Sequence, residues 1–430
     1  ASTAAIGFPP TWTTAADANL NFDTAQSTTQ TLVGTDGGGG TNRTFSLAPG
    51  SNALPAKVGG GTLALITTLA GGEIEGQIAA AGNTSVTFRL TDNATGLFTD
   101  RAINIVGETE FYAFTSHTFT TASVVGATGP TISELRAAYT PTWTDYTSNL
   151  NMTTQGIQEW TVPKTGSYTI AAYGARGGTQ GSQTVSNNRH GKGAKMQGTF
   201  SLTGGDVIKI AVGQLPTDIG TNSDHSGYGG GGTGVIKSPY NTDASILVIA
   251  GGGGGAGYSY ANSTAAGHGL TTNEGGYNFS THADSSGNGG KHTHSPGDCG
   301  WGGGGGGFFT NGWSYPSGDA NSQNSYSQLA SNPGSGNSFT NGGGGGVSGG
   351  CGYPATVQGG FGCGGGGSGG HGGAGGGGYS GGSGSHYTGS GSTGVYGVSG
   401  GGGGSYNSGS SQSNTAGFNN GAGYVVITKL

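Results

Sequence analysis

The glycines of this chain are concentrated in one block, and that distribution limits the possible folds more than any other feature. The chain has 430 residues, of which 101 are Gly, and 62 of these lie among the 170 residues from 251 to 420. Runs of four to six consecutive Gly recur there, as in 302–307, 342–346 and 400–404. Gly has no Cβ and loses more conformational freedom on folding than any other residue. Such a block is therefore either a flexible coil or a structure in which backbones pack directly against one another.

Two features of the block favour the packed alternative. The Gly runs are short and are separated by segments of turn length, which suits a chain that turns back on itself repeatedly. The separating segments carry large aromatic residues such as Phe308 and Tyr379, whereas flexible linkers are built from Gly and Ser. Polyproline-II-type helices have three residues per turn and no internal hydrogen bonds, so their backbone groups are available to neighbouring segments. A bundle of such helices and a flexible linker both remain open at this point.

The rest of the chain has the pattern of short β-strands. Thr84–Leu90 and Arg101–Val106 alternate polar and apolar residues, which is the period of a half-buried strand. Only Thr131–Tyr139 is predicted to be helical, with Leu135 and Tyr139 on one face. The other predicted strands are Thr41–Leu47, Gly61–Leu69, Trp160–Val162, Ser167–Tyr173, Ala194–Leu202, Asp206–Val212, Ser245–Ala250 and Tyr424–Thr428.

The position of the last predicted strand determines how we divide the chain. Because strand character returns after the glycine block, we interpret the block as an insertion into a β domain that the chain re-enters at its end. The predicted divisions are a β-sandwich at 1–107, a second β-sandwich at 108–250, the inserted glycine-rich block at 251–417 and a closing strand within 418–430.

Several motifs in the middle of the chain resemble a known family. They include Gly126–Thr131, Gly156–Pro163, Ala171–Ala175 and Leu247–Gly255. In this order they resemble the glycine-rich extracellular region of the anaplastic lymphoma kinase and leukocyte tyrosine kinase receptors, and glycine-rich proteins of phages and bacteria. The resemblance implies a jelly-roll-like β-sandwich with an inserted polyglycine-II helix bundle. The receptors carry Cys near the positions of Ala122 and Leu135, and this chain does not. It also shows no transmembrane segment and no kinase, so receptor signalling is not expected.

A second resemblance lies in the N-terminal region. Pro10–Thr13, Gly72–Gly76 and Phe88–Asp92 resemble Ig-like or cadherin-like modules of surface and phage proteins, which implies an Ig-like β-sandwich. Such a module beside a glycine-rich domain is most similar to a phage tail or head fibre. The expected function is a non-enzymatic virion fibre or adhesin that binds a host cell-surface glycan or protein. The alternative is a secreted cell-surface filament or adhesin subunit of a microbe.

These resemblances also imply partners and a location. The expected partners besides the host are other virion or filament subunits, and a homo-oligomer such as a trimer is expected. The expected location is the virion surface or the extracellular space. Ala1 fits the end left by a signal peptidase as well as a trimmed chain.

The candidate receptor-binding residues are aromatic side chains of the glycine block, because aromatic residues on a rigid platform dominate recognition energies. The alternative is that they cover the sides of the bundle. The candidates are Trp301, Phe308, Phe309, Trp313, Tyr315, Tyr353 and Tyr387.

Other chemistry is largely excluded by composition and spacing. With 14 Lys and Arg and a net charge of −6, the chain has no basic track for nucleic acid. It has no stretch of 18 apolar residues for a membrane span. His292, His294 and Cys299 match no zinc spacing, and no catalytic motif is present, so we predict neither an enzyme nor a bound cofactor. Calcium at the N-terminal module is one possible exception, with turn-forming aspartates as the alternative; the residues concerned are Asp17, Asp23, Asp36, Asp92 and Asp100. The pairing of Cys299, Cys351 and Cys363 is left open.

Overall fold

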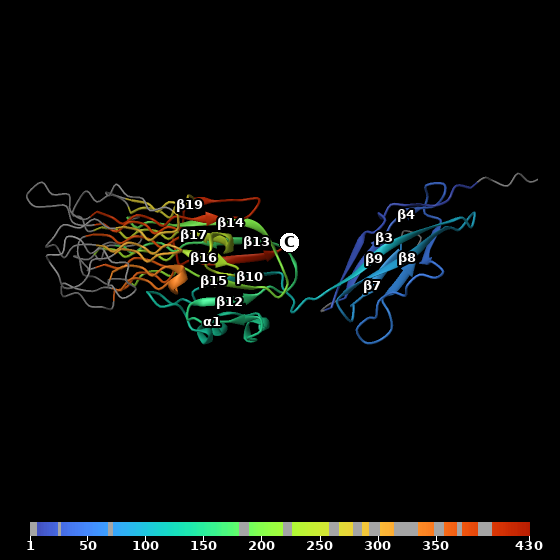
Figure 1. Ribbon diagram of the computed structural model, residues 1–430, viewed down its shortest axis with the longest axis horizontal. Coiled ribbons are helices and arrows are strands. Elements are labelled where there is room, and N and C mark those ends of the chain that lie inside the picture. Colours follow the sequence, from blue (N-terminus) through green and yellow to red (C-terminus); the bar gives the residue numbers. More distant parts are fainter. Residues whose placement is uncertain are drawn as a thin grey trace, which may run out of the picture. The chain divides into compact units, whose positions relative to one another are not determined.

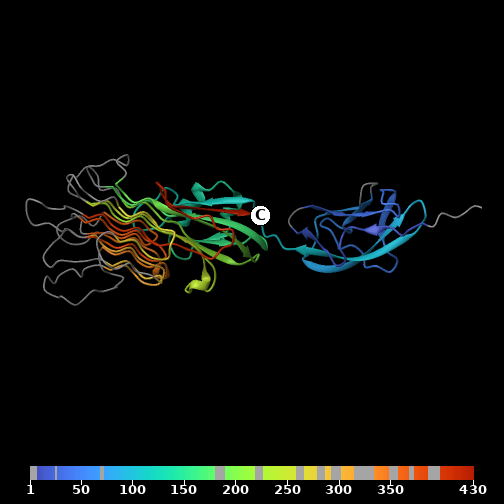
Figure 2. The same cartoon turned by 90° about the horizontal axis from the view of Figure 1, so that it is seen from above.

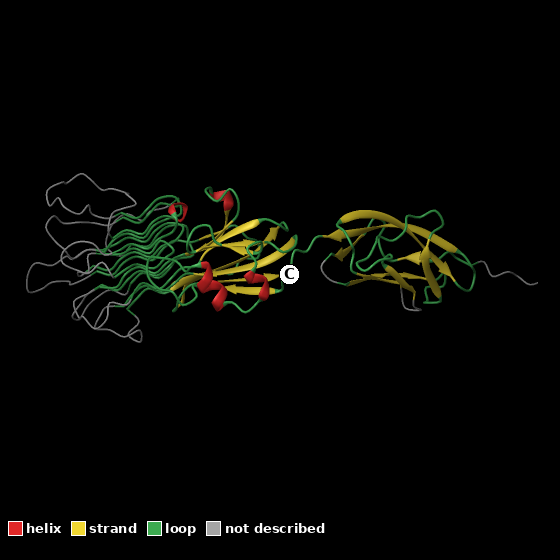
Figure 3. Cartoon of the chain, turned by 90° about the horizontal axis from the view of Figure 1, so that it is seen from below, coloured by secondary structure: helices red, strands yellow, loops and turns green. Residues whose placement is uncertain are grey.

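The fold is all-β, as predicted, and is built from several sheets with one α-helix among the residues that the structure describes (Figures 1 and 3). The structure is a computed structural model. It describes residues 7–24, 27–67, 72–179, 189–217, 226–257, 266–277, 286–291, 302–313, 334–347, 357–367, 372–385 and 398–430. The chain divides into two compact units. The N-terminal unit comprises Ala1–Ala113, Pro163–Thr165 and Thr203–Gly205, and the C-terminal unit comprises Phe114–Val162, Gly166–Leu202 and Asp206–Leu430.

The N-terminal unit contains two larger sheets and one small one. The four-stranded sheet has the order β2 (Asn19–Asp23), β9 (Phe98–Glu108), β8 (Gly82–Asp92) and β5 (Arg43–Leu47), with β2 parallel to β9. The three-stranded sheet has the order β3 (Thr28–Leu32), β7 (Gly72–Gly76) and β6 (Ala64–Thr67). A two-stranded sheet pairs β1 (Thr11–Trp12) with β4 (Gly34–Thr35).

Alternating side chains of both larger sheets form the core of this unit. Phe88 on β8 and Ile105 on β9 are fully buried, and they share one cluster with Phe45 on β5 and Ile74 on β7. The Trp12 ring packs edge-on against Phe45, with 5.5 Å between the ring centroids. The strands predicted from alternation at Thr84–Leu90 and Arg101–Val106 are therefore confirmed as parts of β8 and β9.

The C-terminal unit is built on two antiparallel sheets. The five-stranded sheet has the order β10 (Ser116–Phe119), β20 (Tyr424–Lys429), β13 (Gly166–Tyr173), β14 (Gly193–Leu202) and β19 (Thr415–Asn419). The six-stranded sheet has the order β11 (Leu150–Asn151), β12 (Ile157–Thr161), β15 (Val207–Ala211), β16 (Thr233–Ile236), β17 (Ile246–Ala250) and β18 (Tyr406–Asn407). The predicted strand at Tyr424–Thr428 is β20, which lies between β10 and β13. In this unit the sequence did not predict β10, β11, β16, β18 or β19.

The predicted helix is confirmed as α1 (Ile132–Ala138). Thr131 caps its first turn, and Glu134 accepts the Thr131 N–H in return at 2.7 Å, a capping box. Leu135 is buried, and the Tyr139 hydroxyl donates to Gln158 Oε1 at 2.8 Å. The described 3₁₀ turns are η1 (Thr142–Asp145), η3 (Asp243–Ser245) and η4 (Phe339–Asn341).

The glycine-rich segments continue from the strands and run side by side as hydrogen-bonded extended chains without forming a sheet (Figures 2 and 3). The segment 251–256, which follows β17, illustrates the pattern. The N–H groups of Gly252 and Gly255 donate to segment 374–377 at 2.7 and 2.8 Å. The carbonyls of the same two residues accept from segment 400–403 at 2.8 and 2.9 Å. Residues three apart therefore face the same neighbours.

The residues between them bond other neighbours. Gly253 and Ala256 donate to segment 175–178 at 2.9 and 3.0 Å and accept from segment 227–230 at 2.9 and 2.6 Å. Gly254 donates to Gly267 and accepts from Gly191, both at 2.9 Å. The 251–256 segment is thus bonded to six neighbouring segments of the described chain, whereas a β-strand bonds only two. We call this hydrogen-bonded set of glycine-rich segments the glycine lattice.

The close approach of these backbones explains why the lattice is built from Gly. A Cβ placed on Gly252 would lie 2.3 Å from the carbonyl oxygen of Gly230. A Cβ on Gly253 would lie 1.9 Å from the carbonyl oxygen of Gly191. These distances are far below van der Waals contact, so any larger residue would force the segments apart.

Candidate functional site

The first predicted binding residue in the described chain, Phe308, belongs to a core instead. Its side chain is fully buried in a cluster that includes Ile249, Phe339 and Phe361 and covers the six-stranded sheet. The Phe308 ring lies 4.8 Å from Phe309 and 6.4 Å from Phe339, measured between centroids. A fully buried ring presents no surface to a partner, so the prediction that Phe308 binds a receptor is corrected to a packing role.

Phe309 and Trp313 are half-buried, and Phe309 packs against the same cluster. The Trp313 backbone is part of the glycine lattice, since its N–H donates to Gly290 at 3.0 Å and its carbonyl accepts from Gly304 at 3.1 Å. The remaining predicted binding residues lie outside the described residues: Trp301, Tyr315, Tyr353 and Tyr387.

The ends of the described lattice segments lie beside one another. The Gly257 N–H donates to Ser399 Oγ at 2.9 Å, and the Gly302 N–H donates to the Ser385 carbonyl at 2.8 Å. Segment 251–257 follows directly from β17, so its end lies away from the sheets. The lattice therefore gathers its segment ends at one edge, which we call the distal edge.

The stretches that join these ends differ in length and sequence. Residues 314–333 form a Ser- and Asn-rich stretch with two Tyr, and residues 386–397 contain His386, Tyr387 and Tyr396. Proteins commonly carry binding residues in variable connections between fixed elements, because such connections tolerate changes of sequence while the scaffold keeps its structure.

A hollow of about 150 Å³ lies on the six-stranded sheet, beside the Phe308 cluster. At its rim the Lys209 ammonium lies 4.5 Å from the centre of the Tyr240 ring and 3.7 Å from Glu159 Oε1. The Tyr240 hydroxyl donates to the Val207 carbonyl at 3.0 Å. Burial, together with the charges of Glu159 and Asp206, raises the pKa of Tyr240. Lys209, Glu159 and Tyr240 therefore interact with one another and fix the edge of the hollow. The hollow is lined by Thr154, Ile157, Lys209, Ala211, Ile236, Tyr240, Phe339, Thr340 and Gly342.

A second hollow, of about 280 Å³, follows residues 267–277. Its lining includes His268, Glu274 and the exposed ring of Tyr277. His268 Nδ1 accepts the Lys192 N–H at 3.0 Å. Burial, together with the Lys192 charge, lowers the pKa of His268, which favours the neutral imidazole.

Two of the aspartates considered for calcium shape turns in the N-terminal unit. The Asp36 carboxylate accepts the N–H groups of Gly38, Gly40 and Asn42 at 2.9, 2.7 and 3.0 Å. These hydrogen bonds, chiefly that from Gly40, hold the pKa of Asp36 below its usual value. Asp92 similarly accepts the Ala94 N–H at 2.7 Å. Among the described residues, no group of three or more His, Cys, Asp or Glu is placed to hold a metal ion.

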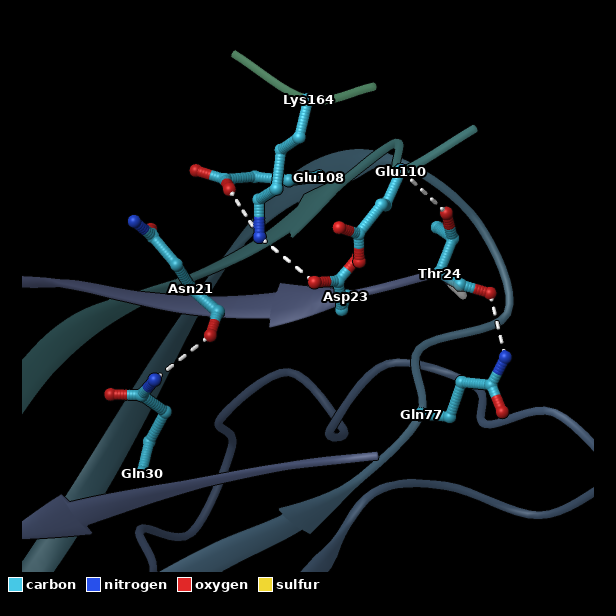
Figure 4. Close-up of polar contacts among 8 residues, drawn as sticks. All are labelled: Asn21, Asp23, Thr24, Gln30, Gln77, Glu108, Glu110 and Lys164. Carbon is cyan, nitrogen blue, oxygen red and sulfur yellow. Dashed lines mark hydrogen bonds and ion pairs between the residues drawn. The ribbon is translucent and has the colours of Figure 1, made fainter. Parts of the chain in front are cut away.

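Two further aspartates form ion pairs. Asp23 lies 2.9 Å from the Lys164 ammonium, which also lies 3.0 Å from Glu108 (Figure 4). Burial lowers the pKa of Lys164, but its bonds to the two carboxylates outweigh that effect and leave the pKa raised. The Asp100 carboxylate accepts hydrogen bonds from Arg89 Nε and Arg89 Nη2, each at 2.8 Å. Asp17 has a positive φ of 56°, a turn conformation.

The Cys363 thiol is free and buried, and burial raises its pKa well above the usual value. Cys299 and Cys351 lie outside the described residues, as do His292, His294 and Asp298. No helix in the described chain is long and apolar enough to cross a membrane.

Comparison with known proteins gives partial sequence matches, of which one is to a receptor. A segment of 100 residues, 23% of this chain, is 37% identical to the leukocyte tyrosine kinase receptor of Mus musculus. The match spans 11% of the receptor, so this chain corresponds to about a tenth of that protein. The predicted resemblance to this receptor is confirmed for that segment, and the other family resemblances stay predictions. No family model matches the chain.

Among solved structures, one similar chain is the sialic acid binding region of the Streptococcus sanguinis SK1 adhesin bound to 3'sLn. It is 18% identical, and the alignment covers 36% of this chain and 44% of that one with a TM-score of 0.24. A score this low informs neither the fold nor the function of this chain.

Proposed function

We propose that this protein is a non-enzymatic adhesin whose glycine lattice is a rigid scaffold for binding segments at the distal edge. The proposed partner is a host cell-surface glycan or protein. The proposed carriers of binding are the stretches that join the lattice segments, including 314–333 and 386–397, rather than the buried Phe308.

The observation that carries this proposal is the hydrogen-bond pattern of the lattice. Partners repeat every three residues along 251–256, and six neighbours surround that segment in the described chain. Three residues per turn is the period of the polyproline-II helix, so we assign the lattice to the polyglycine-II conformation. At about 3 Å per residue, segment 251–257 then extends about 20 Å beyond β17.

The hydrogen bonds between its segments make the lattice suitable as a rigid scaffold. Ordering the backbone of one residue costs about 1–2 kcal/mol, and each hydrogen bond returns about 0.5–1.5 kcal/mol. Residues such as Gly252, whose N–H and carbonyl are both bonded, offset most of that cost without any side chain. Binding segments attached to stiff ends lose less entropy on binding than a free coil does.

The finer assignment rests on the sequence resemblances. We propose a virion fibre protein, a phage tail or head fibre, located on the virion surface and assembled as a homo-oligomer such as a trimer. A secreted microbial filament or adhesin subunit is the alternative and would use the same scaffold. Sedimentation velocity of the purified chain tests the oligomer directly.

Replacing one joining stretch tests the binding role. Residues 314–333 are suitable because lattice contacts are described up to Trp313 and resume at Gly334. A variant in which these residues are scrambled keeps length and composition, and fluorescently labelled chains are compared on a panel of bacterial strains. We expect the native chain to stain a subset of strains and the scrambled chain to lose that staining while its melting temperature is unchanged. Equal staining by both chains, or no staining of any strain by the native chain, would contradict the proposal.

A further inference from the structure

A row of aromatic side chains lies on the outward face of the five-stranded sheet, separate from the distal edge. In the strand register, Tyr173 on β13 is directly opposite Tyr424 on β20 and Lys195 on β14. Side chains alternate between faces along a strand, so these three share one face. The next residues along their strands, Ala172, Val425 and Met196, point to the other face and are buried in the sandwich.

The rings of this row are close enough to act as one surface. Tyr173 and Tyr424 are stacked, with centroids 4.0 Å apart and planes 15° apart. Phe418 on the edge strand β19 extends the row, with its ring 5.8 Å from Tyr173 and 52% of its area exposed. The Lys195 ammonium lies 5.8 Å from the centre of the Phe418 ring. We call these four residues the aromatic row: Tyr173, Tyr424, Phe418 and Lys195.

The strands that carry the row contain no acidic side chain. The five strands of this sheet contain no Asp or Glu, although the whole chain has a net charge of −6. Among the described residues, Lys195 forms no salt bridge with a carboxylate. The next outward positions along the strands are Ala171, Val426 and Gln197, and the positions after these carry hydroxyl groups, at Thr169, Thr199 and Thr428. A ligand on this face therefore contacts the aromatic rings, the Lys195 ammonium and, farther along the strands, hydrogen-bonding side chains.

We propose that this face binds an acidic oligosaccharide. Sugar rings pack their C–H surfaces on the aromatic row, a carboxylate or sulfate pairs with Lys195, and the Thr and Gln side chains bond sugar hydroxyls. The faces of aromatic rings are apolar, and polar groups lie beside them here. Such a surface suits a sugar, which has an apolar C–H face and hydroxyl groups around it. This site is additional to the binding proposed for the distal edge and does not depend on it.

Other occupants fit the same face less well. A stable protein interface buries about 800 Å² on each partner around an apolar centre, whereas this face offers three rings among hydroxyl groups. Nucleic acid binding relies on several phosphate contacts, and this row has a single Lys. A second copy pairing along the β19 edge is the remaining competitor, and the experiment distinguishes it.

Titration of the full chain with three hexasaccharides tests the proposal. Hyaluronan hexasaccharide carries only carboxylates, chondroitin-4-sulfate hexasaccharide carries carboxylates and sulfates, and maltohexaose is neutral. We expect calorimetry to detect at least one acidic probe and weaker or no binding of maltohexaose. A preference between the two acidic probes identifies the anionic group that Lys195 meets.

Two variants and one control locate the binding. Phe418→Ala removes the most exposed ring of the row and should weaken acidic-probe binding by about tenfold or more, as expected for an aromatic side chain that carries much of the binding energy. Lys195→Gln keeps a polar side chain but shortens the stem and removes the charge, so it should abolish the preference over maltohexaose and flatten the salt dependence. Tyr146→Ala, at a ring 63% exposed outside the five-stranded sheet, should change nothing.

The proposal is overturned by any of three results. These are failure of both acidic probes to bind the native chain, unchanged affinity in Phe418→Ala, and equal affinity for maltohexaose. A native dimer that Phe418→Ala converts to a monomer in sedimentation velocity would assign the face to a second copy and would likewise overturn it. Scrambling residues 314–333 leaves this binding intact, so its outcome is independent of the adhesin test.

Discussion

Replacing Gly253 by Ala places a methyl group where the glycine lattice has a carbonyl oxygen. The added Cβ would lie 1.9 Å from the Gly191 oxygen and 3.0 Å from the Gly177 nitrogen. These two atoms are themselves hydrogen-bonded to each other at 2.9 Å. The methyl group therefore pushes two neighbouring segments apart and disturbs a buried hydrogen bond.

The loss of stability is the sum of three terms. Overpacking a close-packed interior costs about 1–3 kcal/mol, and one disturbed hydrogen bond adds about 0.5–1.5 kcal/mol. Replacing Gly by Ala stiffens the unfolded chain and returns about 0.4–1 kcal/mol. The expected net destabilisation of the C-terminal unit by Gly253→Ala is therefore about 0.5–4 kcal/mol.

Gly166→Ala is the matched control. A Cβ on Gly166, at the start of β13, meets no atom within 4 Å, so only the unfolded-state term of about 0.4–1 kcal/mol applies and it is stabilising. Differential scanning calorimetry of the two variants compares them, with the transition of the N-terminal unit as an internal reference. If Gly253→Ala melts with or above Gly166→Ala, the lattice backbones are not in contact and the reasoning fails.

Four further perturbations test other parts of the structure. Lys164→Met should destabilise the N-terminal unit by about 1–3 kcal/mol, because it removes the ammonium group that bonds the buried Asp23 carboxylate. Arg89→Gln breaks a more exposed ion pair and should cost less than Lys164→Met; urea unfolding measures both. Burial lowers the pKa of His117 from 6.5 to about 4, so the unfolded chain takes up the proton first as pH falls. The C-terminal unit should lose stability between those two values, and melts across that range should show a smaller loss in His117→Phe. Phe308→Ala should destabilise the C-terminal unit by about 3–5 kcal/mol because it leaves a cavity. An unchanged melting temperature would show that the Phe308 side chain is exposed. Excess calcium or EDTA should leave the melt of the N-terminal unit unchanged, since the Asp36 oxygens already accept backbone N–H groups.

Most of the regular structure could be predicted because it depends on local patterns. The alternation in Thr84–Leu90 reflects a strand with one buried face, and β8 has that burial pattern. The helix predicted at Thr131–Tyr139 is likewise local, since the hydrogen bonds that cap its start reach only three residues along the chain. Short strands such as β18, of two residues, carry too little pattern to be recognised.

The contacts that decide function could not be predicted in the same way. A run of identical Gly has no apolar period, so nothing in the sequence assigns Gly253 to the neighbours it bonds. Phe308 is buried because Phe339 and Phe361 fold over it, and single-sequence patterns do not reveal such partners. The aromatic row joins Tyr173 to Phe418, which are 245 residues apart; the only local signal was a Tyr at the end of each of two predicted strands.

Amide hydrogen exchange of the glycine-rich segments tests the central claim most directly. Peptides covering residues 251–257, 373–378 and 400–404 contain N–H groups that bond neighbouring segments. A lattice predicts slow exchange in these peptides, comparable to that of the buried strands β13 and β17, with loss of protection in Gly253→Ala. Exchange as fast as that of an unstructured peptide in all three would show that the glycine block is a flexible linker, and the scaffold account would be wrong.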